Sequence, residues 1–289
     1  MVKKLADLYL EARRALIPRD GEMIASQTAR SLVCHVTGKT QAQFLADREM
    51  YADGRVCMAM EEALQRLLAG EPLAYVLGEW DFYGMTLFVD KHVLIPRDDT
   101  VAVTDLAIKQ GLFLDRDPRI LDLCTGSGCI GLAIAHRLTD AKVTLADISQ
   151  DALAVAKKNV SRQHLTARVR CVRVDALEPP TAFLGKFDMI VSNPPYITGE
   201  EMKELDVGVK DYEPNLALYG GEDGLDFYRA IAKNYSAALK NGGFLCFEFG
   251  MGQGDDVCAI LKENGYTILE RARDYNDRER AVLAQWKED

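Results

Sequence analysis

The chain has 289 residues and a formal net charge of −9, with 48% hydrophobic and 27% charged residues. This composition is ordinary for a globular protein, and the length allows one or two domains. An acidic chain lacks the basic face that phosphate binding requires, so we expect no direct nucleic-acid partner. Residues 1–78 carry equal numbers of basic and acidic side chains, so the acidic surplus lies entirely in the remainder.

The first part of the chain, residues 1–78, is expected to form a helical domain. Apolar residues between positions 5 and 16 recur on one helical face. Thr40-Gln41-Ala42-Gln43 has the T-x-x-Q form of a capping box, which opens a helix over about residues 40–50. A further helix over residues 60–68 is closed by Gly70. These segments predict a small helical bundle.

Residues 79–95 differ in character, because aromatic and β-branched side chains alternate around Gly84. This alternation predicts a β-hairpin that links two domains. Residues 96–289 then alternate between apolar strands and helical stretches, which predicts an α/β fold with a doubly wound, mainly parallel sheet of seven strands. The turn before the last strand is too short for a helical crossover, so that strand should be antiparallel.

The cysteines, the histidines and the apolar runs indicate the compartment of the protein and bear on metal binding and membrane insertion. The seven cysteines form no C-x-x-C pair, which favours reduced thiols in a cytoplasmic protein. The four histidines form no H-E-x-x-H motif, so no metal site is expected. Charged residues interrupt the N-terminal apolar positions and no run is long enough to span a bilayer. We therefore expect no signal peptide, no membrane partner and a monomer.

A glycine-rich loop follows the first strand of the predicted sheet. Residues 122–131 read DLCTGSGCIG, in which Gly126, Gly128 and Gly131 satisfy G-x-G-x-x-G, and Asp147 ends the next strand. Glycines allow a tight turn and a close backbone approach, and the acidic residue suits ribose hydroxyls. The pattern indicates a ligand with a ribose over the ends of these two strands.

Two further acidic residues bear on the chemistry of that ligand. Asp122 precedes the loop, where a carboxylate suits the ammonium of an amino acid and would repel a pyrophosphate. S-adenosylmethionine carries that ammonium and no phosphate, which makes it the favoured cofactor; the alternative is that Asp122 only caps the loop. Asp175-Ala176 ends the third strand, where the acid can accept a hydrogen bond from an adenine amino group or can simply form a turn.

The sequence SNPPY, residues 192–196, follows the fourth predicted strand. Two prolines end the strand, because neither can donate a ladder hydrogen bond. The Asn193 side-chain oxygen and the Pro194 carbonyl together offer two acceptors to one NH2 group, and Tyr196 can cover the planar group that bears it. The segment predicts a site for an amide or aminopurine nitrogen; the alternative is a rigid strand-ending turn.

Several longer stretches occur in a recognisable order over residues 70–289: VLIPRDDT, LDLCTGSGCIGLAIA, FDMIVSNPPYI, YEPNLALYGG and NGGFLCFEFG. Together they resemble the HemK/PrmC family of protein-glutamine N5-methyltransferases. The resemblance implies a class I, Rossmann-like methyltransferase fold and S-adenosylmethionine as methyl donor. It also implies that the acceptor is the glutamine of a Gly-Gly-Gln loop in peptide-chain release factors. We expect the helical domain to recognise the protein substrate, because its charge is balanced and a hairpin separates it from the rest of the chain.

The resemblance also implies roles for single residues. It assigns cofactor binding to Cys124, Thr125, Gly126, Ser127, Gly128 and Asp147, adenine binding to Asp175 and Ala176, and substrate binding to Asn193, Pro194, Pro195 and Tyr196. The catalytic residues would be Asn193, Pro194 and Tyr196. Arg97 would lie near the cofactor, or alternatively pair with Asp98 or Asp99. Cys124 stands where the family has a glycine, and the chain has DDT where the family has PET; we expect cofactor binding to be retained.

Other functions stay open on sequence alone. A glutamine of a ribosomal protein is an alternative acceptor. Adenine-N6 methylation of DNA can use the same NPPY motif, but it requires base flipping and a basic groove, which the acidic charge disfavours. A docking module that binds the cofactor without catalysis would have no need of an intact NPPY.

Overall fold

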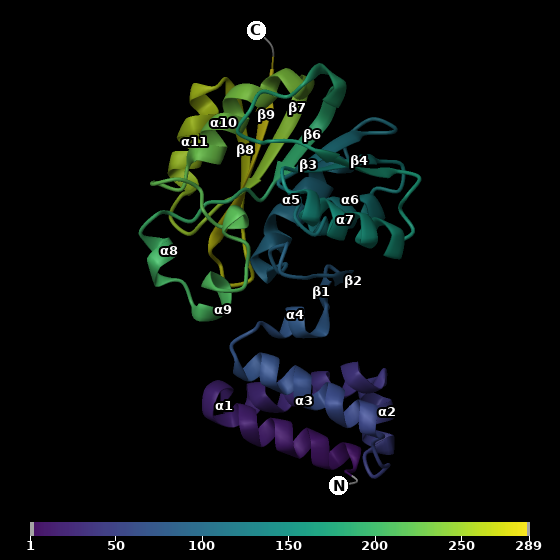
Figure 1. The fold of residues 1–289 in the computed structure, drawn as a ribbon. Helices are drawn as coiled ribbons and strands as arrows, with labels where there is room; N and C mark the ends of the chain where they lie inside the picture. Colours follow the sequence, from purple (N-terminus) through teal and green to yellow (C-terminus); the bar gives the residue numbers. More distant parts are fainter. Residues whose placement is uncertain (1–2, 288–289) are drawn as a thin grey trace. The chain divides into compact units, whose positions relative to one another are not determined.

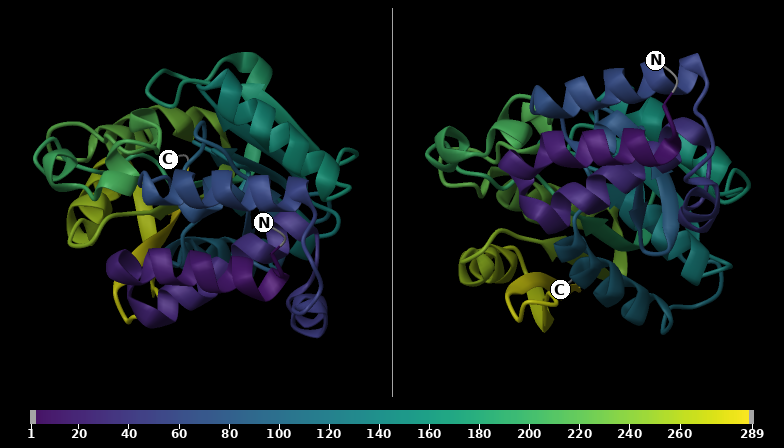
Figure 2. Two further views of the ribbon diagram at one scale, coloured as in Figure 1. Left: turned by 60° about the horizontal axis from the view of Figure 1, so that its bottom comes forward. Right: turned by 90° about the horizontal axis from the view of Figure 1, so that it is seen from below.

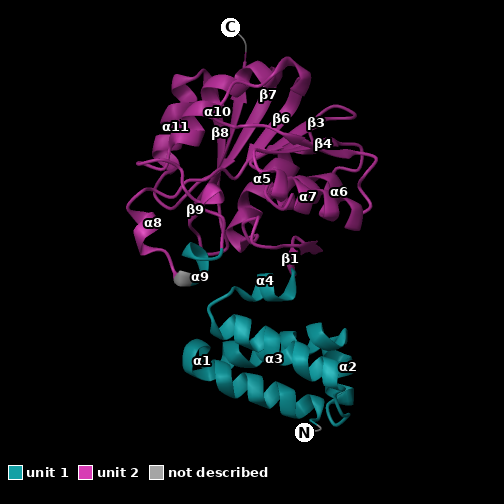
Figure 3. Ribbon diagram, in the orientation of Figure 1, with its two compact units in different colours: residues 1–78, 207–212 teal, residues 79–206, 213–289 magenta. Residues whose placement is uncertain are grey.

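The computed structural model describes residues 3–287, with Val207 described by its backbone only. The chain divides into two compact units, residues 1–78 with 207–212 and residues 79–206 with 213–289 (Figure 3). The hairpin segment 79–95, expected as a separate linker, belongs to the second unit. Among the described residues, no helix combines the length and the apolar character needed to cross a membrane.

Residues 1–78 of the first unit form the helices α1 (Leu5–Thr37), α2 (Gln41–Asp47), α3 (Gly54–Leu68) and α4 (Leu73–Leu77), and residues 207–212 add the short helix α9 (Val207–Lys210). Helices α1 and α3 lie side by side (Figure 2). Helix α1 is kinked at Gly21, where φ is 73°, shortly after Pro18. Proline removes a helical hydrogen bond and glycine tolerates the left-handed conformation, so the two residues account for the kink.

The start of α2 has the predicted capping box. Thr40 Oγ1 accepts a hydrogen bond from the Gln43 N–H at 3.2 Å, and Gln43 Oε1 accepts one from the Thr40 N–H at 2.9 Å. These two bonds satisfy backbone donors that a helix N-terminus otherwise leaves open. The apolar face between positions 5 and 16 is buried in the bundle core, as its spacing predicts.

The second unit contains a two-stranded hairpin, β1 (Glu79–Phe82) and β2 (Met85–Phe88), and a seven-stranded sheet in the order β5-β4-β3-β6-β7-β9-β8 (Figure 1). The sheet strands are β3 (Arg119–Leu123), β4 (Lys142–Asp147), β5 (Val169–Arg173), β6 (Phe187–Ser192), β7 (Leu239–Glu248), β8 (Tyr266–Arg273) and β9 (Glu279–Trp286). Only β9 runs antiparallel to its neighbours. The predicted mainly parallel sheet with an antiparallel last strand is confirmed.

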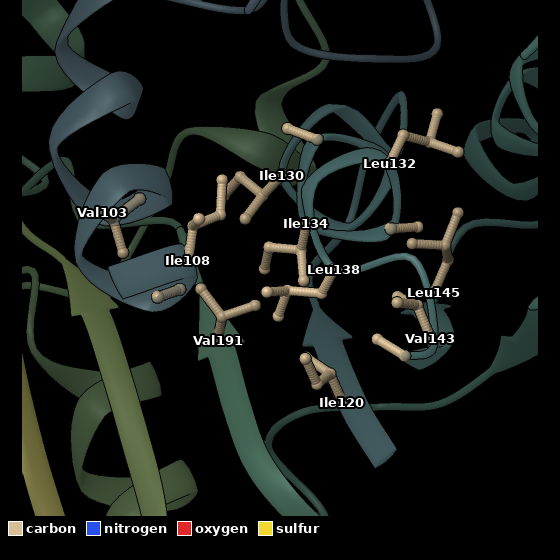
Figure 4. Packing of buried hydrophobic residues seen from close by; sticks show 14 of the residues in the cluster. Val103, Ile108, Ile120, Ile130, Leu132, Ile134, Leu138, Val143, Leu145 and Val191 are labelled. Atoms are coloured by element: carbon tan, nitrogen blue, oxygen red, sulfur yellow. The ribbon is translucent and has the colours of Figure 1, made fainter. Parts of the chain in front are cut away.

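Helices cover both faces of this sheet (Figure 1). One face carries α5 (Val101–Gly111), α6 (Cys129–Arg137) and α7 (Gln150–Arg162), and the other carries α10 (Asp226–Asn234) and α11 (Gly254–Glu263). Figure 4 shows the first of these interfaces, where Ile134 and Val103 pack toward Ile120 and Val191 of the sheet. Short helices α8 (Glu201–Glu204) and α9 (Val207–Lys210) follow β6.

The strand order places the functional site. Strands β4 and β6 flank β3 on opposite sides, so the direction of winding reverses at β3. In open parallel sheets, ligands bind at the carboxyl ends of the strands where such a reversal opens a crevice. Both the glycine loop, which follows β3, and the NPPY segment, which follows β6, lie at that point.

Candidate functional site

A cavity lies at the carboxyl edge of β3, β4, β5 and β6, and its lining comes entirely from the second unit. Most of the predicted site residues line it: Arg97, Cys124, Thr125, Gly126, Ser127, Asp147, Asp175, Ala176, Asn193 and Pro195. Four predicted residues are not part of the lining: Asp122, Gly128, Pro194 and Tyr196. The topology therefore gathers the ends of four separate strands into one site.

The loop after β3 has an unusual backbone. Cys124, Gly126 and Gly128 all adopt left-handed conformations, with φ of 61°, 53° and 86°. The Thr125 N–H donates to the Ala146 carbonyl at 3.0 Å, and the Gly128 N–H donates to the Thr125 carbonyl at 2.8 Å. These bonds fix the turn. Glycine adopts such φ values without penalty, whereas a cysteine at position 124 is strained there.

Asp147 joins the loop to the end of β4. Its Oδ2 accepts a hydrogen bond from the Gly126 N–H at 2.9 Å, and its Oδ1 accepts one from the Ser149 N–H at 2.9 Å. Burial raises the pKa of this carboxyl group, and the backbone hydrogen bonds oppose that shift. Each carboxylate oxygen has more than one lone pair, so Asp147 retains acceptor capacity toward the cavity that it lines.

Asp122 does not line the cavity, contrary to its predicted contact with the cofactor ammonium. It is fully buried, and its Oδ2 accepts hydrogen bonds from Thr125 Oγ1 at 2.5 Å and from the Gly131 N–H at 2.9 Å. Burial raises its pKa to about 7. The alternative, in which Asp122 holds the loop, fits this placement. A Cβ at Gly131 would lie 2.3 Å from Leu145 Cδ2 and 2.9 Å from Asp122 Oδ2, so only glycine allows this close packing.

Asp175 forms the turn that the sequence left open as one of its two possible roles. Its Oδ1 accepts a hydrogen bond from the Leu177 N–H at 2.9 Å, which forms a turn, and its carbonyl accepts one from the Tyr235 hydroxyl at 3.0 Å. Asp175 and Ala176 also line the cavity. Contact with an adenine amino group stays a prediction.

Asn193 lies next to the glycine loop. The register of β3 and β6 pairs Leu123 with Ser192, so Cys124 and Asn193 leave neighbouring strands side by side. The Asn193 Nδ2 donates to Thr100 Oγ1 at 3.3 Å. Among residues 3–287, none donates a hydrogen bond to Asn193 Oδ1 or to the Pro194 carbonyl. Both predicted acceptors are therefore unused by the protein itself.

Tyr196 lines a second, adjacent cavity instead, together with residues 250–253. Its carbonyl accepts a hydrogen bond from Gln253 Nε2 at 3.0 Å. Burial raises the pKa of its hydroxyl far above the usual range. The hypothesis that Tyr196 covers the substrate's planar group gains no support from this placement, since its ring is not part of the main cavity.

Arg97 lines the cavity and pairs with Glu213. The expected alternative partners, Asp98 and Asp99, do not pair with it; Asp99 instead contacts Arg280, with Nη2 and Oδ2 2.8 Å apart. Glu213 is 5% exposed, and its Oε2 also accepts a hydrogen bond from the Ile95 N–H at 3.4 Å. The ion pair thus fixes the segment after α9, whose Pro214, Leu216 and Ala217 complete the lining.

Sequence reasoning missed Asn159, which is fully buried in α7. Its Oδ1 accepts a hydrogen bond from the Phe88 N–H at 2.6 Å, and its Nδ2 donates to the carbonyls of Phe88 at 3.0 Å and Ser127 at 2.9 Å. Asn159 therefore ties the hairpin to the glycine loop. In the sequence, Asn159 is marked only as an amide side chain on an otherwise apolar helical face, where a buried polar group needs hydrogen-bond partners.

Other lining residues also escaped prediction, among them His92, Cys129, Ile148 and Phe227. Ile148 follows Asp147 directly, so its position at the end of a strand could have been predicted from the sequence. The residues next to Phe227 contain no pattern that would have predicted its place in the cavity. Within the described part of the chain, no group of three or more His, Cys, Asp or Glu side chains is arranged to hold a metal ion.

Comparisons with known proteins bear on both units. Residues 7–78 match the family model described as PrmC N-terminal domain, and residues 106–208 match the model described as Methyltransferase small domain. A release factor glutamine methyltransferase of Clostridium acetobutylicum is 36% identical over 281 residues, which cover 97% of this chain and 98% of the relative. A protein of the same name from Chlorobaculum tepidum is 39% identical, with 89% and 90% coverage.

Solved structures share the fold. The crystal structure of a methyltransferase from Pyrococcus furiosus superposes with a TM-score of 0.51 at 16% identity, covering 79% of this chain and all of that one. At this identity, the likeness extends to the fold alone.

Proposed function

The chain belongs to the release factor glutamine methyltransferase family, and from this we propose that it transfers a methyl group from S-adenosylmethionine to the side-chain amide nitrogen of a glutamine in a peptide-chain release factor. The resemblance drawn from the sequence motifs is thereby confirmed, as is the class I methyltransferase fold. We take the acceptor to be the glutamine of a Gly-Gly-Gln loop.

One observation carries the proposal: two unused acceptors, Asn193 Oδ1 and the Pro194 carbonyl, lie beside the glycine loop at the point where the sheet reverses its winding. An amide NH2 has two hydrogens and so matches two acceptors. An amide nitrogen is a poor nucleophile, because its lone pair is delocalised. Two acceptors raise its electron density and stabilise the positive charge that grows during transfer.

The cavity residues fit the proposed methyl donor. Asp147 retains acceptor capacity for ribose hydroxyls, and the neutral loop of residues 124–128 allows a close approach. Ile148, Ala176 and Phe227 give an apolar lining for an adenine ring. When bound, the donor supplies an electrophilic methyl group on a sulfonium. The chain contributes orientation, which can lower the barrier by up to about 7–11 kcal/mol.

The reaction requires no strong general base in the site. The proton on the amide nitrogen becomes very acidic once the methyl group is attached, and it can leave to water. What the site must do is hold the nitrogen with its lone pair toward the methyl group, and the fixed backbone of the two prolines suits that task.

We assign recognition of the release factor to the first unit. It exposes large apolar side chains, among them Met23, Met58 and Tyr51, at 73%, 68% and 66% of their surface. Replacing these three with serine should raise KM for the full-length release factor while leaving transfer to a short glutamine peptide unchanged. A KM for the full-length substrate equal to that of the wild type would contradict this assignment.

The function is tested with labelled S-adenosylmethionine and three purified classes of acceptor: release factors, ribosomal proteins and DNA. We expect label to enter a release factor, in line with the family to which the chain belongs, and not DNA, because the chain is acidic. Label in a ribosomal protein or in DNA, with none in a release factor, would replace the proposed acceptor. Cofactor binding without transfer to any of them would support a docking module instead.

A further inference from the structure

A buried carboxyl group lies behind Asn193, and the chemistry proposed above does not use it. Glu248 ends β7 and is 1% exposed. The register of β6 and β7 pairs Ser192 with Phe247, so Glu248 and Asn193 follow neighbouring positions at the edge of the sheet. A carboxyl group is rarely buried this deeply without partners, so neighbouring groups must offset the free-energy cost of burying Glu248.

Thr100, Asn193 and Glu248 form a small polar network. Hydrogen bonding from the Thr100 and Asn193 side chains lowers the pKa of Glu248, and the Asn193 Nδ2 donates to Thr100 Oγ1 at 3.3 Å. Thr100 is itself buried, and its carbonyl accepts a hydrogen bond from Thr104 Oγ1 at 2.8 Å. The network is therefore anchored in the start of α5 as well as in β7.

This network determines which way the Asn193 amide points. A carboxyl oxygen that accepts cannot face an amide oxygen, so Asn193 must turn its NH2 group toward Glu248. The amide oxygen then lies on the other side, where no described residue donates to it. The two ends of an amide are similar in size. Without Glu248, the orientation of the Asn193 side-chain amide would therefore be weakly determined.

The surrounding charges keep the carboxyl group in place. Arg280 favours its ionised form and Asp99 opposes it, and Arg280 is held by Asp99 at 2.8 Å and Asp274 at 3.3 Å. Burial raises the pKa of Glu248 to about 8. Within the described residues, its Oε2 has no hydrogen-bond partner, so a proton carried there would leave Oε1 able to accept from Asn193.

We propose that Glu248 is a positioning residue for Asn193: with Thr100, it binds the Nδ2 hydrogens of Asn193 and so directs Oδ1 toward the substrate amide. The kinetic consequence rests on the proposed methyl transfer, whereas the orientation of Asn193 does not. Two experiments separate these two parts.

The first experiment measures hydrogen exchange of the Asn193 side-chain NH2 group by NMR, with the signal assigned by its loss in Asn193→Ala. Glutamine at position 248 keeps the oxygen that accepts, and methionine has a similar length but no acceptor. We expect slow exchange in the wild type and in Glu248→Gln, and exchange faster by about tenfold in Glu248→Met. The same rate in all three proteins would overturn the proposal.

The second experiment is a double-mutant cycle on methylation of a release factor. We expect Glu248→Met to lower kcat by about tenfold or more with unchanged cofactor affinity, and Glu248→Gln to stay within about threefold of the wild type. On an Asn193→Ala background, Glu248→Met should have no further effect, because Glu248 acts through Asn193. Additive losses would contradict the proposal. A wild-type protein that methylates no release factor would refute the proposed function, and the exchange rates would still decide the role of Glu248.

Discussion

Acidic residues in and behind the wall of the cavity are held in different ways on its two sides. On the side of β3 and β4, the carboxylates of Asp122 and Asp147 accept hydrogen bonds from backbone N–H groups of the glycine loop and of residues close to it. On the side of β6 and β7, Glu213 and Glu248 instead contact side chains from distant parts of the chain, Arg97 and Asn193 among them.

Because of this difference, a single substitution removes different kinds of hydrogen bond on the two sides. A backbone donor stays in place when its own side chain is changed, so the first side is sensitive mainly to its acceptors and to its glycines. On the second side, the contacts between side chains can be removed from either partner, whereas the bond from the Ile95 N–H to Glu213 can be removed only at Glu213. Truncation there leaves a buried group unpaired, which costs about 1–3 kcal/mol or more for a charged group.

The largest effect is expected on the second side, for Asn193→Ala. The variant deletes one acceptor of the substrate amide and leaves the backbone of the two prolines intact. Since charge on the nitrogen grows in the transition state, kcat should fall by about 10²–10³-fold. Cofactor affinity should change only slightly. Single-turnover methylation at saturating substrate, together with a cofactor titration, measures both quantities.

Asn264→Ala is the matched control for this variant. Asn264 is a half-buried asparagine whose Nδ2 donates only to the Ile260 carbonyl of its own helix, at 2.8 Å. It should keep the wild-type rate. If Asn193→Ala kept more than about a third of that rate, Asn193 would not stabilise the transition state as proposed.

On the first side, Asp147→Ala should act on binding and not on the chemical step. It removes the proposed acceptor for the ribose hydroxyls, and charge-assisted hydrogen bonds contribute about 1.5–3 kcal/mol each. Cofactor affinity should fall at least about tenfold by isothermal titration. Wild-type affinity would place the ribose elsewhere.

A smaller effect is expected where the glycine loop depends on a side chain. Asn159→Ala removes three hydrogen bonds to the hairpin and the loop and takes a partner from the backbone of Phe88 and of the buried Ser127. The free energy of unfolding should fall by about 1–3 kcal/mol, measured by urea denaturation against Asn264→Ala. An unchanged midpoint would mean that the hairpin and the loop are held by other contacts.

The smallest effect concerns the backbone of the same loop. Cys124→Gly relieves a left-handed cysteine, which costs about 1–2 kcal/mol, but adds glycine's entropy, about 0.5–1 kcal/mol. The net stabilisation should lie between zero and about 1.5 kcal/mol. Gly126→Ala is the opposite test, because a Cβ there meets no atom within 4 Å and the strain alone remains. Stabilisation by Gly126→Ala would contradict this explanation.

The same contrast explains what could be predicted from the sequence. Strands, the glycine loop and Asp147 are marked by residues close together in the chain, and the structure places them as expected. The partner of Arg97 lies 116 positions away, and Asn159 contacts Phe88 across 71. Such pairs depend on how helices and strands pack, so the contacts of Glu213 and Glu248 carried no local signal.

The central claim is that this site methylates the side-chain nitrogen of one glutamine in a release factor. The most direct measurement is tandem mass spectrometry of a release factor after incubation with wild-type protein and S-adenosylmethionine. The account predicts one added methyl group on the glutamine of the Gly-Gly-Gln loop, and none when that glutamine is replaced by glutamate. A methyl group on another residue, or equal methylation of the glutamate variant, would contradict it.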